Sequence, residues 1–217
     1  MMLNQGRPQL TREIRRIERD ILRMGALVEQ SFRLSHRALI ERDLNAANQI
    51  PRIDKKVDRI YRQIETDCIA IMTLQAPVAQ DLRCLSVFMQ LVRDLERIGD
   101  YAEDIAEIAI KIFPYEPHHT LPEIAIMSHH AQAMLATSLK CLADMDAVCA
   151  KEIKQLDDAV DDAYEHLYKT LAYQKNIEGV IEPILLLGLA IRFLERMADH
   201  ATNIGQRVAY MITGIRS

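Results

Sequence analysis

The 217 residues, 49% of them apolar, suffice for one large domain or two small ones around a sizeable core. Seven glycines, seven prolines and no tryptophan favour helices throughout and argue against an all-β sandwich. A net charge of −4 gives the chain no overall attraction to nucleic acid or acidic lipid, so we expect no nucleic-acid partner.

Cysteine usage and hydropathy indicate where the protein works. No C-x-x-C spacing occurs, which excludes a zinc ribbon, and each cysteine lies in an apolar helical run that predicts a small buried side chain. The sequence shows neither a charged-then-apolar leader nor an uncharged run long enough to span a membrane. We therefore expect a soluble, cytoplasmic protein in a reducing compartment. The four cysteines are Cys68, Cys84, Cys141 and Cys149.

The first half of the chain predicts three helices. Apolar residues at three-and-four spacing indicate one long helix over 10–42. Asp43 can cap a short helical turn, and Pro51 then stands where the start of a second helix tolerates proline. Pro77 breaks this second helix, because a proline disfavours helical geometry at the residue before it. A third helix follows and runs to about Phe113.

The second half begins after the clearest linker in the chain, residues 114–122, which holds three prolines in nine residues. Further helices are expected at about 123–143, 153–174 and 183–212, with a stop near Gly214. The tandem histidines of the linker could bind a metal, but a solvated loop is the simpler interpretation.

The two halves repeat each other. QLDDAVD at 155–161 matches RIDKKVD at 52–58, and the two R-x-L-E-R segments lie at corresponding places. We expect an all-α fold of two tandem three-helix bundles, with six long antiparallel helices side by side. The predicted boundaries are 1–113 for the first repeat, 114–122 for the linker and 123–217 for the second repeat.

Acidic residues four apart occupy equivalent positions in both repeats, and each such pair lies on one helix face. Their distances from the hairpin turns bring four carboxylates to one level in each half. They flank the apolar stripes rather than joining them, so the sequence leaves open a metal site or plain solvation. The eight acids are Asp54, Asp58, Glu96 and Asp100, and then Asp157, Asp161, Glu195 and Asp199.

An all-oxygen donor set suits iron, manganese, magnesium or calcium, whereas zinc accepts carboxylates but prefers nitrogen or sulfur. His200 is a weaker candidate ligand, because it lies about 100° around the helix from Asp199. We interpret the neighbouring arginines as ion-pair partners of the acids. No Glu-x-x-His pair lies on an expected helix, and no serine triad or phosphate loop appears, so we expect no enzyme. These arginines are Arg93, Arg97, Arg192 and Arg196.

From about residue 10 to 213 the sequence resembles the PhoU family of phosphate-signalling proteins. The resemblance lies in LQAPVAQDLR at 74–83, DLERIGD at 94–100 and LERMADHATNI at 194–204, with support from MGALVE at 24–29 and ERDL at 41–44. It implies two three-helix bundles side by side. It also implies a regulator that restrains phosphate uptake and signalling when phosphate is plentiful.

The resemblance further implies partners and cofactors. The partners would be the high-affinity phosphate ABC transporter and the phosphate-sensing histidine kinase, with membrane contact only through them and a homodimer as the expected assembly. Some members carry multinuclear iron or zinc clusters at paired motifs that map onto the eight acids. Ala198 replaces Gly99 in the second motif, and Gln206 stands where an acid is common. The alternatives are a metal-free scaffold that binds basic partner surfaces and a carboxylate-bridged oxidase.

Overall fold

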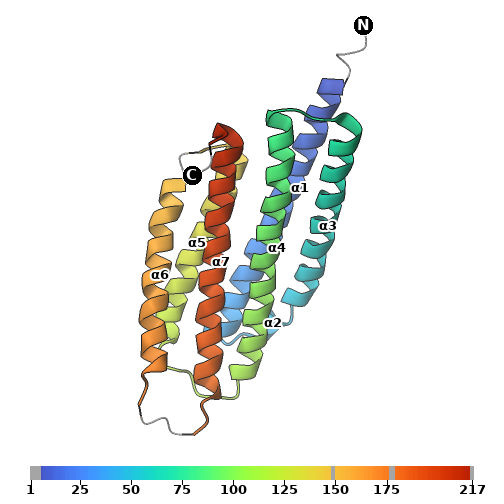
Figure 1. Ribbon diagram of the computed structural model, residues 1–217. Helices are drawn as coiled ribbons and strands as arrows, with labels where there is room; N and C mark the ends of the chain where they lie inside the picture. Colours follow the sequence, from blue (N-terminus) through green and yellow to red (C-terminus); the bar gives the residue numbers. More distant parts are fainter. Residues whose placement is uncertain (1–5, 148–149, 176–178, 216–217) are drawn as a thin grey trace.

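A computed structural model describes residues 6–147, 150–175 and 179–215 (Figure 1). These residues form six long helices and one short helix, and they contain no strand, which confirms the predicted all-α class. The helices are α1 (Gly6–Ile40), α2 (Leu44–Ala47), α3 (Ile50–Gln75), α4 (Gln80–Ile112), α5 (Leu121–Asp144), α6 (Ala150–Ala172) and α7 (Glu182–Thr213).

The long helices form two packed layers. α3, α4, α7 and α6 lie side by side in that order, and α1 and α5 pack behind them (Figure 1). One bundle comprises α1, α3 and α4, the other comprises α5, α6 and α7, and contacts of α4 with α7 and of α1 with α5 join the two. α4 and α7 run antiparallel at the centre of the front layer. The exact boundaries of the two repeats stay a prediction.

Local chemistry explains where the helices begin and end. Asp43 Oδ1 accepts hydrogen bonds from the amides of Asn45 and Ala46, so the predicted cap of α2 is confirmed. The first helix ends at Ile40 rather than at Arg42, because Arg42 takes a positive φ of 57° ahead of that cap. Prolines stand in the first turns of α3, α5 and α7.

The remaining helix ends agree with the expectations to within a few residues, which is the usual uncertainty of helix limits. The break at Pro77 separates α3 from α4, with Ala76 and Ala79 on either side of it at positive φ. Gly214 caps α7 in the left-handed region at φ 76°. Most of the turn expected at 176–179 lies outside the described residues.

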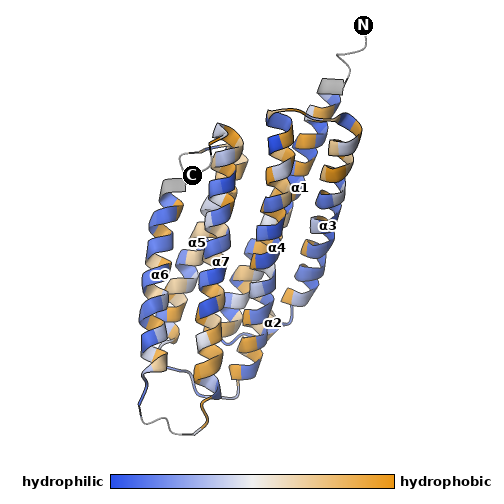
Figure 2. Ribbon diagram, in the orientation of Figure 1, coloured by the Kyte–Doolittle hydropathy of each residue, from blue (hydrophilic) through white to orange (hydrophobic). Residues whose placement is uncertain are grey.

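The core is built from the predicted apolar stripes. On α4, Leu91, Leu95 and Ile98 are fully buried, and the hydrophilic residues of α3 and α6 line the outer edges of the layer (Figure 2). Among the described helices none combines the length and apolarity that crossing a bilayer requires.

The cysteines depart from the expectation of four reduced thiols. Cys68 and Cys84 are free, and burial raises their pKa values to about 12 and about 11, so both are inert protonated thiols near neutral pH. Cys141 is disulfide-bonded, which corrects the prediction for that residue. Cys149 lies outside the described residues. Burial in an apolar helix therefore predicted the chemistry of the first two cysteines but not that of Cys141.

Candidate metal centre

The first group of acids lies between α3 and α4. Asp54 and Asp58 project from α3, and Glu96 and Asp100 project from α4; all four are half-buried. A Cβ built on Gly99 would stand 3.8 Å from Asp54 Oδ1, so Asp54 lies close against α4. Asp54 Oδ1 is buried and has no hydrogen-bond partner, which is costly for a carboxylate oxygen. We call these four residues the first carboxylate cluster.

Electrostatics shows that the acids of the two helices act on each other. The pKa of Asp100 is raised to about 6, chiefly by burial and also by the charges of Glu96, Asp54 and Asp58, while Arg97 acts in the opposite direction. Burial also raises the pKa of Glu96, where Arg97 opposes the shift and Asp58 and Asp54 reinforce it. These repulsions run between α3 and α4, so the hairpin does bring the two predicted pairs together.

Glu103 is a further member that the sequence analysis missed. Burial raises its pKa, and the next largest cause is the charge of Asp54 on the other helix. The signal was present in the sequence, because Glu96, Asp100 and Glu103 follow one helix face at i, i+4 and i+7. The first half therefore gathers five acids rather than four.

Arg97 compensates part of this charge, as predicted, whereas Arg93 forms no ion pair among the described residues. Arg97 Nε lies 3.7 Å from Glu96 Oε2, and its Nη1 lies 3.4 Å from Asp100 Oδ2. Arg62, one turn after Asp58 on α3, forms an ion pair with it. These arginines are largely exposed, so the pairs contribute little to stability.

The second group lies between α6 and α7. Asp157 and Asp161 project from α6, and Glu195 and Asp199 project from α7; we call them the second carboxylate cluster. Burial raises the pKa of Glu195, and Asp199 and Asp161 raise it further against Arg192 and Arg196. Glu195 Oε2 is buried without a hydrogen-bond partner, as Asp54 Oδ1 is in the first cluster.

Arginines flank the second cluster as they flank the first. Arg192 Nη1 lies 2.6 Å from Glu195 Oε1, and Arg196 Nη1 lies 3.4 Å from Asp199 Oδ2. The interpretation of these residues as ion-pair partners of the acids is therefore confirmed for both.

Both clusters face away from the rear layer. Asp67 lies nine residues after Asp58, on the opposite face of α3, and pairs with Arg16 of α1 at 3.0 Å. His166 lies nine residues after Asp157, on the opposite face of α6, and is 3.1 Å from Glu123 of α5. The flanks that carry these pairs turn toward α1 and α5, so the acids of the clusters lie on the opposite side.

His200, the weaker candidate ligand, is held elsewhere. Its Nδ1 lies 2.9 Å from Oδ1 of Asp94, a buried carboxylate on α4 that the sequence analysis did not single out. Arg207 Nη1 lies 2.7 Å from Asp94 Oδ2, close enough for an ion pair although the geometry is not that of a hydrogen bond. His200 therefore serves the interface between α4 and α7.

Comparison with known proteins identifies the architecture. The sequence profile described as the PhoU domain matches residues 21–109 and 124–208, one match in each half. The chain belongs to the PhoU family. The phosphate-specific transport system accessory protein PhoU homolog of Synechocystis is 58% identical over 213 residues, which cover 98% of this chain and 95% of that relative.

Two crystal structures extend the PhoU comparison to three dimensions. PhoU from Pseudomonas aeruginosa superposes with a TM-score of 0.90 at 32% identity, over 94% of this chain and 99% of the other. The phosphate transport system regulatory protein PhoU from Streptococcus pneumoniae gives a TM-score of 0.88 at 27% identity, over 96% of this chain and 99% of the other.

The two halves of this PhoU chain differ at the site. Thr202 stands where the first half has Glu103, and its Oγ1 donates a hydrogen bond of 3.0 Å to Asp157 Oδ1. Asn203 stands where the first half has Asp104, so the second cluster lacks two nearby negative charges. On α6, however, Asp158 and Asp162 stand where the first half has Lys55 and Arg59, and both charges raise the pKa of Asp161. The two clusters therefore differ in where their charges lie rather than in one being poorer in acids.

The PhoU resemblance implies a metal, and the donors present fit one in type. Each cluster offers only carboxylate oxygens and holds one that is buried and unpartnered, as a hard cation requires. In the described part of the chain, however, no three His, Cys, Asp or Glu side chains converge closely enough to hold an ion. Binding would therefore require acids such as Asp58 and Asp100 to turn from Arg62 and Arg97 toward a shared ion.

Proposed function

We propose that this PhoU-family protein is a non-enzymatic regulator of phosphate homeostasis. It would restrain high-affinity phosphate uptake and phosphate-sensing two-component signalling when phosphate is plentiful. The observation that carries this proposal is the family match in both halves, together with relatives described as accessory or regulatory proteins of phosphate transport. Fold alone would not suffice, since one fold hosts many functions.

Each carboxylate cluster would bind cations as part of this role. Iron or zinc in a multinuclear arrangement is the family-based expectation, and manganese, magnesium or calcium fit the oxygen donors as well. Asp54, Asp58, Glu96 and Asp100 would hold the ions of the first half. A bound cation would remove the mutual repulsion that raises the carboxyl pKa values in the cluster. The corresponding residues of the second half are Asp157, Asp161, Glu195 and Asp199.

The proposed partners are the phosphate ABC transporter and the phosphate-sensing histidine kinase. The protein would work in the cytoplasm as a homodimer and would reach the membrane only through these partners. The free thiols of Cys68 and Cys84 agree with a reducing compartment, whereas the disulfide at Cys141 counts against it. A count of reactive thiols in protein taken directly from cells into denaturant tests the location.

The deciding experiment combines metal analysis with partner capture. Wild type and the E96Q and E195Q variants are purified without chelator from cells grown in high and low phosphate. The proposal expects wild type to carry metal and to co-purify with transporter or kinase in high phosphate, and each variant to lose metal. Equal metal content in all three proteins would contradict the metal role. Partner capture that ignores the phosphate supply would contradict the regulatory role.

A metal-free scaffold is the second candidate, and the lack of three converging ligands among the described residues favours it. In that case the acids would meet a basic partner surface directly, as complementary charges at an interface do. The same E96Q and E195Q variants would then weaken partner capture while metal content stays at zero. High salt would weaken capture as well, because it screens exposed charges.

A further inference from the structure

A pair of histidines, one from each repeat, lies between the two helices of the rear layer and shares no residue with the carboxylate clusters. His36 of α1 is half-buried, and His129 of α5 is exposed. Their ring centroids lie 4.5 Å apart at an interplanar angle of 33°. Two imidazoles from packed helices at this distance form either a plain stacking contact or a chelating pair.

Hydrogen bonds orient one of the two rings. Nδ1 of His36 lies 3.0 Å from Oγ of Ser128, which is buried, and Gln132 donates to the same Oγ at 3.2 Å. When Nδ1–H donates to Ser128, Nε2 keeps its lone pair. Metal-binding histidines typically use one ring nitrogen as a donor to a fixed oxygen and the other as ligand. The contact with Ser128 is the supporting interaction that such a ligand needs.

The electrostatic surroundings keep this ring in its binding form. Burial lowers the pKa of His36, His129 lowers it further, and Glu41 partly opposes them. The neutral imidazole, which coordinates metals, is therefore the favoured form near neutral pH. A second imidazole beside the first supplies a second nitrogen ligand.

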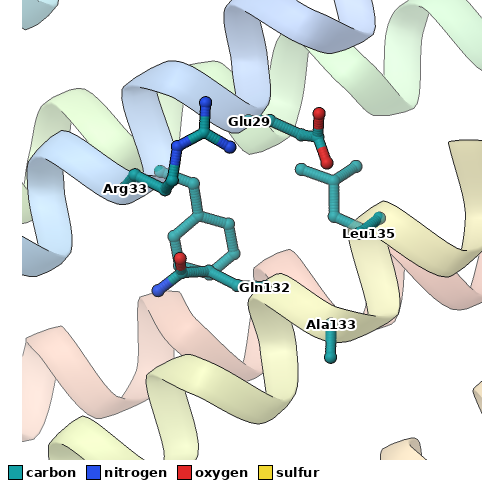
Figure 3. A pocket seen from close by; sticks show the side chains of 7 residues that line it. Glu29, Arg33, Gln132, Ala133 and Leu135 are labelled. Carbon is teal, nitrogen blue, oxygen red and sulfur yellow. The ribbon is translucent and has the colours of Figure 1, made fainter.

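A groove of about 250 Å³ lies between the same two helices, and its lining includes Glu29 and Leu135 but neither histidine. Figure 3 shows Glu29 and Arg33 of α1 across this groove from Gln132 of α5. Gln132 lines the groove and also donates a hydrogen bond to Ser128, so one side chain connects the groove to the residue that orients His36.

We propose that His36 and His129 bind a borderline divalent ion such as Zn²⁺, Ni²⁺ or Cu²⁺, with water in its remaining positions. Imidazole nitrogen selects these ions, whereas the carboxylate clusters suit harder ones. Metal–nitrogen bonds of about 2.0–2.1 Å require the two ligand nitrogens to approach to about 3 Å. Rotation of the exposed His129 side chain supplies this approach while Ser128 keeps His36 in place.

The other adjacent histidines show what a structural pair looks like. The rings of His118 and His119 lie 4.2 Å apart, but both nitrogens of His118 already contact protein oxygens. Thr120 Oγ1 lies 2.8 Å from Nδ1, and Gln174 Oε1 lies 3.1 Å from Nε2. His118 therefore anchors the linker, which corrects the interpretation of this residue as part of a solvated loop, and this pair is the matched control.

Cu²⁺ is the probe, because it binds nitrogen sites most tightly of the divalent series and reports nitrogen ligands by electron paramagnetic resonance. Tag-free wild type is expected to bind one Cu²⁺ with hyperfine coupling to two nitrogens. H129A, at an exposed position, and H36A should each lose one nitrogen coupling and bind Cu²⁺ at least tenfold more weakly. S128A should weaken binding about tenfold with both nitrogens retained, because only the supporting hydrogen bond is lost.

Two controls separate this site from the others. H119A and the E96Q/E195Q double variant should both keep the two-nitrogen signal at wild-type affinity. An unchanged signal in H129A, in protein whose circular dichroism matches wild type, would overturn the proposal. Loss of the signal in H119A would overturn it as well. Failure of the carboxylate clusters to bind metal leaves this test unaffected, since the histidine pair shares no residue with them.

Discussion

Nδ1 of His200 lies 2.9 Å from Oδ1 of Asp94 across the interface between α4 and α7. In the internal repeat, Phe193 corresponds to Asp94 and Tyr101 corresponds to His200. The rings of Tyr101 and Phe193 stack across the same interface with centroids 5.5 Å apart. One contact between α4 and α7 is therefore polar and its counterpart is aromatic. The packing of the two repeats is symmetric in position but not in chemistry.

This asymmetry makes Asp94 a sensitive position for stability. D94A would leave the half-buried Arg207 and His200 without their carboxylate, and removal of one partner of a buried pair typically costs about 3–5 kcal/mol. Since Arg207 is partly exposed, we expect D94A to lower the free energy of unfolding, measured with urea, by about 3 kcal/mol. E107A removes an exposed pair with Lys111 and should change stability by less than about 0.5 kcal/mol. Equal midpoints for the two variants would contradict the role of Asp94.

The raised carboxyl pKa values predict how metal-free protein responds to pH. The pKa of Asp100 rises from 3.8 to about 6 on folding, mainly through burial, so the folded state binds its proton more tightly than the unfolded state. The resulting stability is fully present below about pH 4 and is lost as pH rises through about 6. Thermal melts in chelator should therefore show this decline between about pH 4 and about pH 6. D100N should flatten the decline; an unchanged pH profile in D100N would contradict the assignment.

Added cation should reverse the same decline at pH 7. An ion that binds only the folded state stabilises it by about 2.7 kcal/mol at a hundredfold excess over the dissociation constant. D100N should start from a higher melting temperature in chelator and gain less from the ion, because it lacks both the repulsion and a ligand. Calorimetry with manganese or magnesium measures both effects. A full gain in D100N would exclude Asp100 as a ligand.

The two clusters should differ in affinity. Glu103 and Asp104 add negative charge beside the first cluster, whereas Thr202 and Asn203 stand at the equivalent places beside the second. E96Q and E195Q should therefore each abolish one of two binding events of unequal affinity. T202E should strengthen the event that E195Q abolishes, because it adds a negative charge beside the second cluster. Two equal sites in wild type, measured by titration calorimetry, would contradict this prediction.

Gly99 provides a test of equivalence between the repeats. A Cβ at this position would meet Val57 at 3.7 Å and Asp54 at 3.8 Å, which are ordinary contacts, and Ala198 already occupies the equivalent position. G99A should be neutral or stabilising by up to about 1 kcal/mol, since alanine favours helix over glycine. G214A is the contrast, because Gly214 has a φ of 76° and Arg83 lies against it, so the variant should be destabilised. Urea unfolding compares the two.

Most of the fold could be predicted from the sequence, because the signals were local or repeated. Asp43, Pro51 and Gly214 act through their own backbone, and the stripe through Leu91, Leu95 and Ile98 follows from helical period. The level of the acids followed from counting residues away from each hairpin turn. These features need no knowledge of distant neighbours.

What the sequence could not supply was which flanks of different helices meet. Asp94 looked like one more acid in a motif until α7 placed His200 and Arg207 against it. His36 and His129 are more than ninety positions apart, and only the packing of α1 on α5 brings their rings together. The sequence predicted that arginines would pair with the acids of the clusters. It did not predict the side-chain orientations, in which no three acids converge on one point among the described residues.

The placement of both clusters on the outward side of a single helical layer has a consequence for avidity. α4 and α7 hold the two acidic sites at a fixed separation on one rigid surface, so engagement of one site sets a high effective concentration at the other. A partner with two basic sites at matching distance would therefore dissociate far more slowly than either contact alone allows. Any flexible joint between the repeats would forfeit that gain.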